Sequence, residues 1–478
     1  MKSTIENLNK LFLQRFGILP ESIIHLPLSG SDRKYFRMNG KDFSVIGTFN
    51  NNLKENVAFI SFTKTFIKLG LKVPKIYSEK LNENIYLLED LGDKTLFQLV
   101  EENRVEDSIS QPLISKYQSA LKHLLKFQIE SKGEIDFSVS YPRASFDQQS
   151  MIWDLNYFKY YFLKLADVVF DEQQLENDFN NLINFLLQAR NDFFLYRDFQ
   201  SRNIMIKDGE LYFIDYQGGR KGALQYDVAS LLFDSKANLP FDFREELLEF
   251  YLSGLKKYFP IDEAEFKQFY NVFALIRILQ AMGAYGFRGY FERKDHFLSS
   301  IPFAIRNLDW LLKKGLPLQL PELQKAILQI IESDKLKSIS DTNKIAGNLT
   351  VRIKSFSYKK GIPQDEAGNG GGFVFDCRLI QNPGRYDEYK NLTGKDQPVI
   401  DFLLSQSNAE EFLTNVYRII DATVKNYLKN NYTNLLVGFG CTGGQHRSVF
   451  CAEQLAKHLI EKFDIKIDLQ HTEMDKFQ

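Results

Sequence analysis

Apolar residues along about the first 90 positions of the chain follow the period of a helix in some stretches and that of a strand in others. An Asn-Gly pair at 39–40 separates two strand-like stretches, and this pair favours the tight turn of a β-hairpin. The alternation predicts a small α+β lobe. Its expected helices cover residues 5–16 and 55–69, and its expected strands cover residues 34–38, 43–49 and 85–92.

Helical periodicity dominates the next part of the chain, from about residue 95 to residue 335. One strand–loop–strand pattern, residues 194–217, interrupts it. Residues 336–348 are polar and without a regular pattern, which predicts a linker between two domains. The first domain would then cover residues 1–335, with an N-lobe of about residues 1–92 and a C-lobe of about residues 93–335.

The pattern changes again after the predicted linker. Short strand-like stretches surround a glycine-rich loop at 368–372, and a buried-strand pattern is followed by a loop and a helix. Residues 349–478 are therefore expected to form a second, α/β domain. Its expected strands are 349–356, 373–376 and 434–439, and its clearest expected helix is 448–463.

Composition limits the class of protein. A chain of 478 residues with 44% hydrophobic and 25% charged residues suits two or three soluble domains. The formal net charge of −1 gives no overall field that would favour nucleic acid or an anionic membrane as partner. The three cysteines lack the spacing of a zinc site, and we find neither an apolar signal core nor an uncharged run long enough to span a bilayer. We expect a cytoplasmic protein.

The interruption within the helical part carries the chemistry of the first domain. It places Asp198, Asn203 and Asp215 on one strand–loop–strand unit. Kinase-type phosphoryl transfer uses one carboxylate to take the proton of the substrate hydroxyl, and two oxygen ligands to hold Mg²⁺ on the nucleotide. A polar surface turn between two strands is the alternative interpretation. The strand frame, the preceding Arg197 and a glycine turn upstream favour the kinase.

Five stretches of the first domain carry a family resemblance: 30–37, 87–92, 196–203, 214–217 and 226–232. They resemble the aminoglycoside-phosphotransferase-like small-molecule kinases, and most closely the bacterial branch that phosphorylates N-acetylmuramate and N-acetylglucosamine of the cell wall at the anomeric hydroxyl. The resemblance covers about residues 1–335 and implies an α+β bilobal, protein-kinase-like fold that uses ATP and Mg²⁺. It implies that Asp198 is the catalytic base and that Asn203 and Asp215 hold the metal.

The same resemblance implies how the nucleotide is bound. Backbone groups of a hinge, from Glu89 to Leu91, would hydrogen-bond adenine, although the charged side chains at this strand end suit simple solvation equally well. Asp227 begins an apolar helix, where a helix cap or a buried polar anchor is as plausible as a substrate contact. The residues implied for nucleotide binding, apart from a cation, are Ser29, Gly30, Ser31, Glu89 and Leu91.

Two positions depart from the kinase pattern. Tyr196 stands where the family usually has histidine, which a loop-supporting position tolerates. The strand at 43–49 lacks the lysine that grips the nucleotide phosphates; the favoured branch also tends to lack it, but some cation must offset their charge. Strand alternation puts Arg33 and Arg37 on one face, and we predict Arg33 for this role. Glu55, in the next helix, would orient such a cation, but a solvated helix start is the preferred interpretation.

The second domain carries a glycine-rich loop between a buried strand and a helix. Backbone amides in such a loop and at a helix N-terminus form an anion site, to which Arg447 would add donors. A tight turn that needs glycine only for its geometry is one alternative. A cysteine phosphatase loop is another, because Cys441 and Arg447 have its spacing, but no general-acid loop is identifiable. The predicted sugar-phosphate site comprises Cys441, Thr442, Gly443, Gly444, His446, Arg447 and Ser448.

Residues 355–363, 375–383, 392–396, 440–448 and 452–455 resemble the C-terminal domain of the RNase adaptor protein RapZ. This resemblance implies binding of an amino-sugar phosphate, small regulatory RNAs as partners in some bacteria, and a tendency to self-associate into homo-oligomers. The nucleotide-binding half usual in that family is absent, since no Gly-x₄-Gly-Lys-Ser/Thr motif occurs. Sixteen Lys and Arg balance sixteen Asp and Glu over residues 349–478, so RNA is not the favoured partner.

Both halves of the chain point to amino sugars. We expect an ATP-dependent kinase that phosphorylates a sugar hydroxyl in cell-wall recycling, with a second domain that senses an amino-sugar phosphate. The lack of an acidic cluster favours a neutral or anionic sugar over an aminoglycoside. The alternative function is an RNA-binding, RNase-adaptor-like regulator whose kinase domain is degenerate. Antibiotic resistance is disfavoured, because it would leave the second domain without a role.

Overall fold

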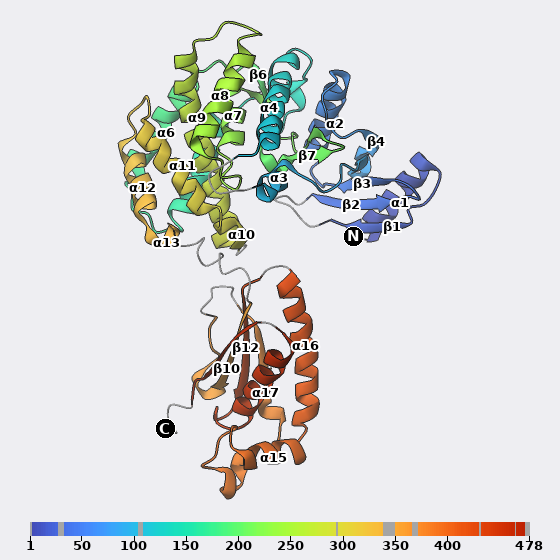
Figure 1. Cartoon of the computed structure of the whole chain (residues 1–478), viewed down its shortest axis with the longest axis vertical. Coiled ribbons are helices and arrows are strands. Elements are labelled where there is room, and N and C mark those ends of the chain that lie inside the picture. Colours follow the sequence, from blue (N-terminus) through green and yellow to red (C-terminus); the bar gives the residue numbers. More distant parts are fainter. Residues whose placement is uncertain are drawn as a thin grey trace. The chain divides into compact units, whose positions relative to one another are not determined.

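The chain forms two compact units, Met1–Ile339 and Ser340–Gln478, in the computed structural model (Figure 1). Each unit has a hydrophobic core of its own, and each is described separately below. In the described part of the chain, no helix is both long enough and apolar enough to cross a bilayer. The structure describes residues 2–26, 33–103, 109–292, 295–337, 349–365, 371–429, 432–463 and 465–473.

The first unit begins with a five-stranded antiparallel sheet in the order β1-β2-β3-β5-β4. Side chains of β5 alternate between its faces: Ile85 and Leu87 pack against α1, whereas Tyr86 and Leu88 join the core that contains α2. The predicted hairpin and both predicted helices are present. The elements are α1 (Lys2–Phe16), β1 (Ser22–His25), β2 (Lys34–Asn39), β3 (Ser44–Phe49), α2 (Leu53–Lys68), β4 (Ile76–Lys80) and β5 (Ile85–Glu89).

The rest of the first unit is mainly helical. Its central helix, α9 (Glu263–Tyr285), buries residues around its whole circumference and contacts α5, α7 and α11. A turn of π-helix, Gly286–Phe291, continues it. The other helices are α3 (Leu96–Glu102), α4 (Gln111–Leu125), α5 (Gln148–Phe158), α6 (Glu172–Leu186), α7 (Leu224–Leu232), α8 (Phe241–Leu255), α10 (Asp295–Leu298), α11 (Ile301–Lys314), α12 (Pro321–Glu332) and α13 (Asp334–Lys337).

Two small antiparallel sheets frame the predicted strand–loop–strand unit. β6 (Phe193–Leu195) pairs with β9 (Arg220–Gly222), and β7 (Ile204–Lys207) pairs with β8 (Glu210–Phe213). Asp208 and Gly209 make the two-residue turn between β7 and β8, with φ of 51° and 78°. Both values lie in the left-handed region that such hairpin turns require and that this residue pair tolerates.

The predicted linker, residues 336–348, overlaps the last helix of the first unit. Leu336 and Lys337 belong to α13, and Leu336 is buried in the core of the first unit with 2% exposure. Residues 338–348 lie outside the described part of the chain.

The second unit is an α/β domain around a four-stranded, fully parallel sheet in the order β11-β12-β10-β13. Helix α17 contacts β10, β12 and β13, and α16 contacts α17. The parallel pairing explains why β12 is a continuous apolar run. The elements are β10 (Thr350–Ser357), β11 (Phe373–Asp376), α15 (Gln397–Ser405), α16 (Ala409–Lys429), β12 (Asn434–Cys441), α17 (Arg447–Lys462) and β13 (Lys466–His471).

Candidate active site

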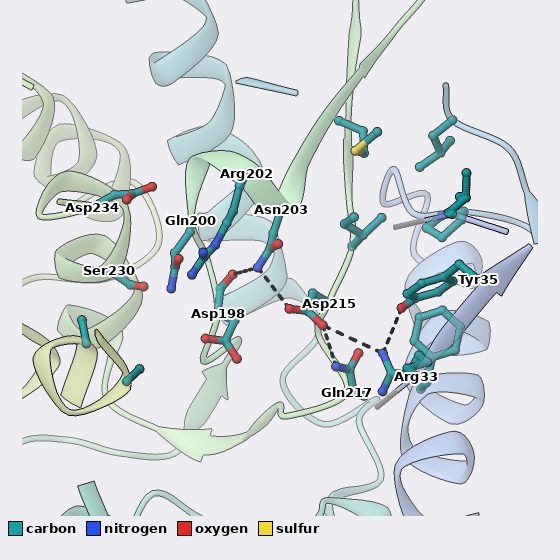
Figure 2. Close-up of a pocket in the computed structure, with 18 of the residues that line it drawn as sticks. Arg33, Tyr35, Asp198, Gln200, Arg202, Asn203, Asp215, Gln217, Ser230 and Asp234 are labelled. Carbon is teal, nitrogen blue, oxygen red and sulfur yellow. Dashed lines mark hydrogen bonds and ion pairs between the residues drawn. The ribbon is translucent and has the colours of Figure 1, made fainter. Parts of the chain in front are cut away.

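The structure brings the three predicted catalytic and metal residues together (Figure 2). The Nδ2 of Asn203 donates to the Asp198 carbonyl oxygen at 2.9 Å and to Oδ2 of Asp215 at 3.2 Å. Asp215 also accepts from Nε2 of Gln217 at 2.7 Å. The Asp198 carboxylate lines the cleft and makes no hydrogen bond to any described residue. It is therefore placed to accept a proton from a bound hydroxyl.

The donor set fits a magnesium ion. Because Asn203 is held through its Nδ2, its Oδ1 has no partner among the described residues. Burial, and then the like charge of Asp198, raises the pKa of Asp215, so a cation at this carboxylate would relieve an unfavourable anion. The ion would have few protein ligands, as Mg²⁺ usually does when phosphates and water complete its shell.

Two residues of this site have strained backbone. Arg197 and Asp215 have φ of 82° and 69°, which non-glycine residues rarely adopt. The Arg197 guanidinium is fixed by the Asp154 carboxylate at 2.6 and 2.8 Å and by the Tyr226 hydroxyl at 2.6 Å. This clamp holds the strained loop that presents Asp198.

Asp227 is a buried anchor of the catalytic loop. Its two oxygens accept from the backbone amides of Tyr196 at 2.7 Å and of Arg197 at 2.9 Å. Its side chain is fully buried, and burial raises its pKa to about 7. Of the roles considered from the sequence, a buried polar anchor is the one the structure shows. Tyr196 supports the same loop, since its hydroxyl donates to the carbonyl of Ile214 at 2.6 Å.

Arg33, the predicted phosphate-binding cation, lines the same cleft as Asp198, Asn203 and Asp215. It is 3% exposed, it donates to Oε2 of Glu55 at 3.0 Å, and its Nη1 lies 3.9 Å from Oδ1 of Asp215. Its Nε has no hydrogen-bond partner among the described residues. Arg33, Tyr35 and Arg37 all line the cleft, as alternation predicts for residues two apart. The preferred interpretation of Glu55 as a solvated helix start is wrong, because its carboxylate binds Arg33.

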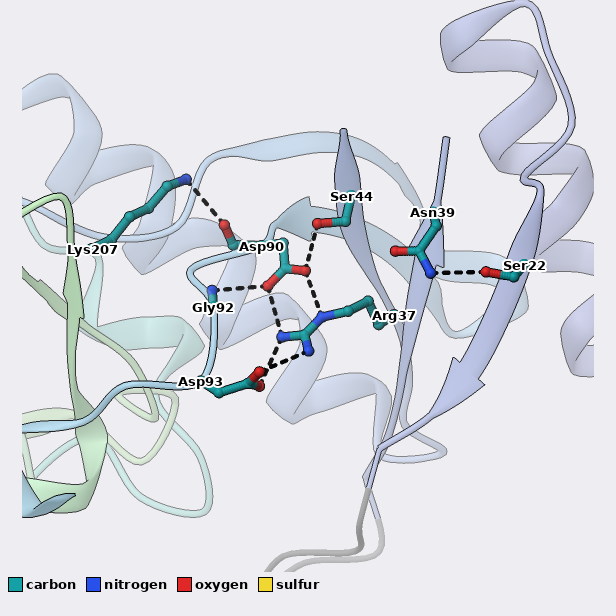
Figure 3. Close-up of polar contacts among 8 residues, drawn as sticks. All are labelled: Ser22, Arg37, Asn39, Ser44, Asp90, Gly92, Asp93 and Lys207. Carbon is teal, nitrogen blue, oxygen red and sulfur yellow. Dashed lines mark hydrogen bonds and ion pairs between the residues drawn. The ribbon is translucent and has the colours of Figure 1, made fainter. Parts of the chain in front are cut away.

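The hinge is tied to the sheet through Asp90 (Figure 3). Arg37 donates to both Asp90 oxygens at 2.6 and 3.0 Å, Ser44 donates at 2.7 Å and the Gly92 amide at 2.9 Å. Burial alone would raise the pKa of Asp90, but the hydrogen bonds from Arg37, Ser44 and Gly92 hold it below its usual range. Asp93 accepts from the same arginine at 2.9 Å. The network fixes the course of the chain from β5 into the hinge.

Glu89 is also engaged, since Nζ of Lys207 donates to its carboxylate at 2.7 Å and to the Asp90 carbonyl at 3.0 Å. The side chains of Glu89 and Asp90 are therefore paired with other residues and are not simply solvated charges at a strand end. The buried Leu91 lines the cleft, and its amide donates to no described residue. An open amide at this position suits the edge of a purine ring. Ser29, Gly30 and Ser31, the other predicted nucleotide residues, lie outside the described part of the chain.

One cleft of about 700 Å³ joins these residues. Its first part is lined by apolar side chains next to the hinge, including Ile46, Leu88 and Met205. Its second part extends past Asp198 to polar side chains of α7 and α9, including Ser230 and Arg277. Figure 2 shows Ser230 and Asp234 on the side of Asp198 away from Arg33. The two parts are large enough together for a nucleotide and a small acceptor.

The glycine-rich loop of the second unit connects β12 to α17. Thr442 and Gly443 are exposed, whereas the other predicted members of this site are buried. Arg447 donates from Nη1 to the carbonyls of Arg378 at 3.2 Å and Ile380 at 2.9 Å. His446 Nε2 lies 2.9 Å from the carbonyl oxygen of Tyr389, and burial lowers the pKa of this histidine.

Cys441 packs inside that loop. The Gly444 amide donates to its Sγ at 3.2 Å, and the Ser448 hydroxyl lies 3.1 Å from the same atom. Because the Arg447 Nη1 binds main-chain carbonyls, the loop does not present the arginine fork that a cysteine phosphatase aims at phosphate. Cys377, Cys441 and Cys451 are all free and buried, as ordinary small core residues are.

Two polar positions of the site were not predicted from the sequence: Asp154, which holds Arg197, and Arg277, which lines the second part of the cleft. Each is a polar residue on an otherwise ordinary helix. A carboxylate or guanidinium on a helix looks the same in the sequence whether it faces water or a cleft, so no local signal distinguishes them.

The second unit matches a known domain family. Residues 349–475 match the family model of the RapZ C-terminal domain. Relatives named nucleotide-binding protein include those of Ruminiclostridium cellulolyticum (38% identical over 133 residues, 28% of this chain and 44% of the relative) and Aeromonas hydrophila (37% over 151 residues, 31% and 50%). A third, from Bifidobacterium adolescentis, is 41% identical over 128 residues, 27% of this chain and 39% of the relative. The chain thus spans half or less of the length of these relatives.

Solved structures resemble the first unit. Aminoglycoside phosphotransferase APH(4)-Ia, as a thermostable mutant, is 13% identical with a TM-score of 0.42 and covers 65% of this chain and 100% of its own. A choline/ethanolamine kinase family protein from Mesorhizobium loti is 13% identical with a TM-score of 0.44, covering 69% and 99%. Likeness at this level says nothing about the acceptor that this chain uses.

The phosphotransferase enzyme family model (APH) matches residues 28–266, which is half of the chain. The predicted fold class is confirmed: a kinase-like phosphotransferase fold is followed by an α/β domain with a parallel sheet. The chain therefore belongs to the phosphotransferase enzyme family, and a RapZ C-terminal domain follows its phosphotransferase domain.

Proposed function

We propose that this protein is an ATP-dependent kinase that phosphorylates a hydroxyl of an amino sugar of cell-wall recycling, N-acetylmuramate or N-acetylglucosamine, at the anomeric position. The observation that carries the kinase is one cleft that holds Asp198, Asn203 and Asp215 together with the buried Arg33. The choice of sugar rests on the sequence resemblance of the first domain, and on the RapZ-like domain that follows it.

The residues divide the work of phosphoryl transfer between them. Asp198 accepts the proton of the sugar hydroxyl as its oxygen attacks the terminal phosphoryl group. Arg33, held by Glu55, offsets phosphate charge in place of the strand lysine of other kinases. Asn203 and Asp215 would hold Mg²⁺, which when bound neutralises charge on the phosphate oxygens. The open amide of Leu91 and the carbonyl of Glu89 would hydrogen-bond adenine.

The second domain would sense an amino-sugar phosphate. Its glycine-rich loop offers the exposed Thr442 and Gly443 next to the N-terminus of α17. Backbone amides at such a position attract phosphate groups. A pathway metabolite bound there would tune the kinase.

A degenerate kinase that serves as an RNA-binding adaptor is not proposed. The argument for a degenerate kinase was that the strand at 43–49 lacks a lysine. Arg33 offers a buried cation in the same cleft, which weakens that argument. RNA binding by the second domain also lacks the cation excess that usually accompanies it.

An acceptor panel tests the proposal. The purified chain is incubated with ATP and Mg²⁺ and with free sugars, aminoglycosides or choline, and ADP release is measured. We expect sugar-dependent release with an amino sugar, and none with choline. Asp198→Asn, which removes the proposed base, should abolish this release. Asp309→Asn, which removes a carboxylate on the surface of α11, is its matched control. Release that no sugar stimulates would sink the proposal.

A further inference from the structure

Three arginines line the second part of the cleft, where the acceptor would bind: Arg202, Arg277 and Arg288. Two carboxylates line it as well. Asp198 is the proposed base, and Asp234 accepts from the hydroxyl of Ser201 at 2.7 Å and from its amide at 3.3 Å. The remaining polar side chains in this part, such as those of Gln200, Ser230 and Gln280, are neutral. Cations therefore outnumber the carboxylates at the acceptor end.

Among these three arginines, Arg277 is buried and is held in place by hydrogen bonds to two neighbouring side chains. It lies on α9 and is 7% exposed. Its Nε donates to Oγ of Ser230 at 3.1 Å, and its Nη1 donates to Oε1 of Gln280 at 2.7 Å. Both partners are neutral, and no described carboxylate forms an ion pair with it. A buried charge normally has a counter-ion, so the missing one is expected from a ligand.

Burial with neutral partners does not by itself define a ligand site. Arg244 is also buried, and it donates to the Leu239 carbonyl at 2.8 Å and to Asn307 at 2.7 Å. It does not line the cleft, and it lies over the Phe233 and Phe241 rings at 5.0 and 4.5 Å. Arg244 is therefore a packing residue, whereas Arg277 faces the space that a substrate would fill.

Arg202 and Arg288 add to the positive charge in the second part of the cleft to different degrees. Arg202 is exposed and forms no ion pair with a described carboxylate. Burial, and then the charge of Arg202, lowers the pKa of Lys236 nearby, whereas Asp234 and Glu101 raise it. Arg288 is paired with Glu292 at 3.3 Å and contributes less.

We propose that the acceptor carries a carboxylate, and that Arg277, assisted by Arg202, selects the acceptor by binding that group. The inference rests on the proposed function, since it assumes that the acceptor occupies this part of the cleft. Ser230, which holds Arg277, lies one helical turn after the loop anchor Asp227, so the anion site and the catalytic base share one support. A polycationic acceptor would instead meet unpaired like charge.

The test compares two sugars that differ in one charge: N-acetylmuramate and its neutral carboxamide, which has nearly the same size. We expect kcat/KM of the wild-type protein to be at least about tenfold higher for the acid. Arg277→Gln should lower kcat/KM for the acid by about 10- to 100-fold and leave that for the amide within about twofold. Arg306→Gln, an exposed arginine of α11 that does not line the cleft, is the matched control.

A second variant covers the case in which Arg277→Gln does not fold, as thermal unfolding would show. Arg202 is exposed, so Arg202→Gln should fold and should lower kcat/KM for the acid alone by about three- to tenfold. Equal turnover of acid and amide by the wild-type protein, or equal losses for both in the variants, overturns the inference and leaves the sugar kinase standing.

The panel separates this inference from the proposed function. For this purpose the panel also includes glycerate, a hydroxy acid that is not a sugar. If only glycerate is phosphorylated and Arg277→Gln impairs it, the sugar is wrong and the anion site stands. Turnover of choline alone overturns both. If nothing is turned over, calorimetry of the acid and the amide in the presence of ADP and Mg²⁺ decides. Weaker binding of the acid to Arg277→Gln supports the anion site, and unchanged or absent binding overturns it.

Discussion

Arg33 is the cation that we propose in place of the lysine that strand β3 lacks. Arg33 precedes β2 rather than lying on β3, yet its buried side chain reaches Glu55 of α2 and approaches Asp215. Strand alternation was sufficient to favour Arg33 from the sequence. The sequence pattern did not favour a pairing of Glu55 with this arginine, because a glutamate in the first turn of a helix is stabilising in water even without a partner.

The first prediction concerns this pair. Arg33→Met should raise KM for ATP and lower kcat/KM for ATP about 100-fold, because the phosphates lose a preorganised cation in a water-poor cleft. Lys34→Met, which removes the neighbouring cation outside the lining of the cleft, should stay within about twofold. Steady-state kinetics with varied ATP measure both. Equal effects of the two variants would remove Arg33 from the site.

The second prediction concerns the anchor Asp227 and pH. Its pKa is raised to about 7 by burial, whereas an aspartate in the unfolded chain titrates near about 4. Between these values the folded state holds the proton more tightly, so the contribution of Asp227 to the free energy of unfolding decreases as pH rises from about 4 to about 7. Asp227→Asn removes this titration.

Urea unfolding of both proteins at several pH values measures the difference. The stability of the wild-type protein relative to Asp227→Asn should decline across that window and level off above it. A difference that is constant or that grows with pH would contradict the assignment.

At the scale of elements, strongly amphipathic segments were predictable, and so was the edge strand β11, but the edge strands β4 and β13 were not. The helices α1 and α2 and the strands β2, β3 and β5 lie within a few residues of their predicted bounds. β4 escaped prediction because no residue of this edge strand is fully buried, so its side chains do not alternate in character. β13 is an edge strand of the other sheet and is equally unmarked.

The third prediction concerns the π-helical turn after α9. A Cβ on Gly286 would lie 1.8 Å from the Tyr161 carbonyl oxygen, and backbone cannot give way easily. Gly286→Ala should therefore destabilise the first unit by about 2 kcal/mol or more. Gly254→Ala is the control, because its Cβ would meet only the tip of Leu125 at 2.6 Å and the helix gains about 1 kcal/mol in propensity. Chemical unfolding compares them; equal stability would refute this packing argument.

At the scale of the whole molecule, two separate cores make the units separable. The motifs predicted phosphoryl transfer in the first unit from three residues, and an anion site in the second from a glycine-rich loop. The sequence does not indicate whether the second unit affects the first, because no motif in it reports on coupling between two domains.

The fourth prediction tests that coupling. The fragment 1–337 should keep sugar kinase activity, whereas a fragment that ends at 333 should be less stable, because it loses the buried Leu336. Glucosamine 6-phosphate should change the activity of the full chain and leave that of the fragment unchanged. Gly443→Glu should abolish the effect in the full chain, since its side chain has room and its charge repels phosphate. An effect that persists in the fragment would exclude the second domain as the sensor.

The central claim is that Asp198 takes the proton of a sugar hydroxyl, and the most direct test is a single-turnover measurement. Excess wild-type protein with ATP and Mg²⁺ is mixed with N-acetylmuramate, and formation of the sugar phosphate is followed by rapid quench. We predict that Asp198→Asn slows this step by at least about 100-fold, while Asp309→Asn matches the wild-type protein. Equal rates for Asp198→Asn and the wild-type protein would contradict the claim.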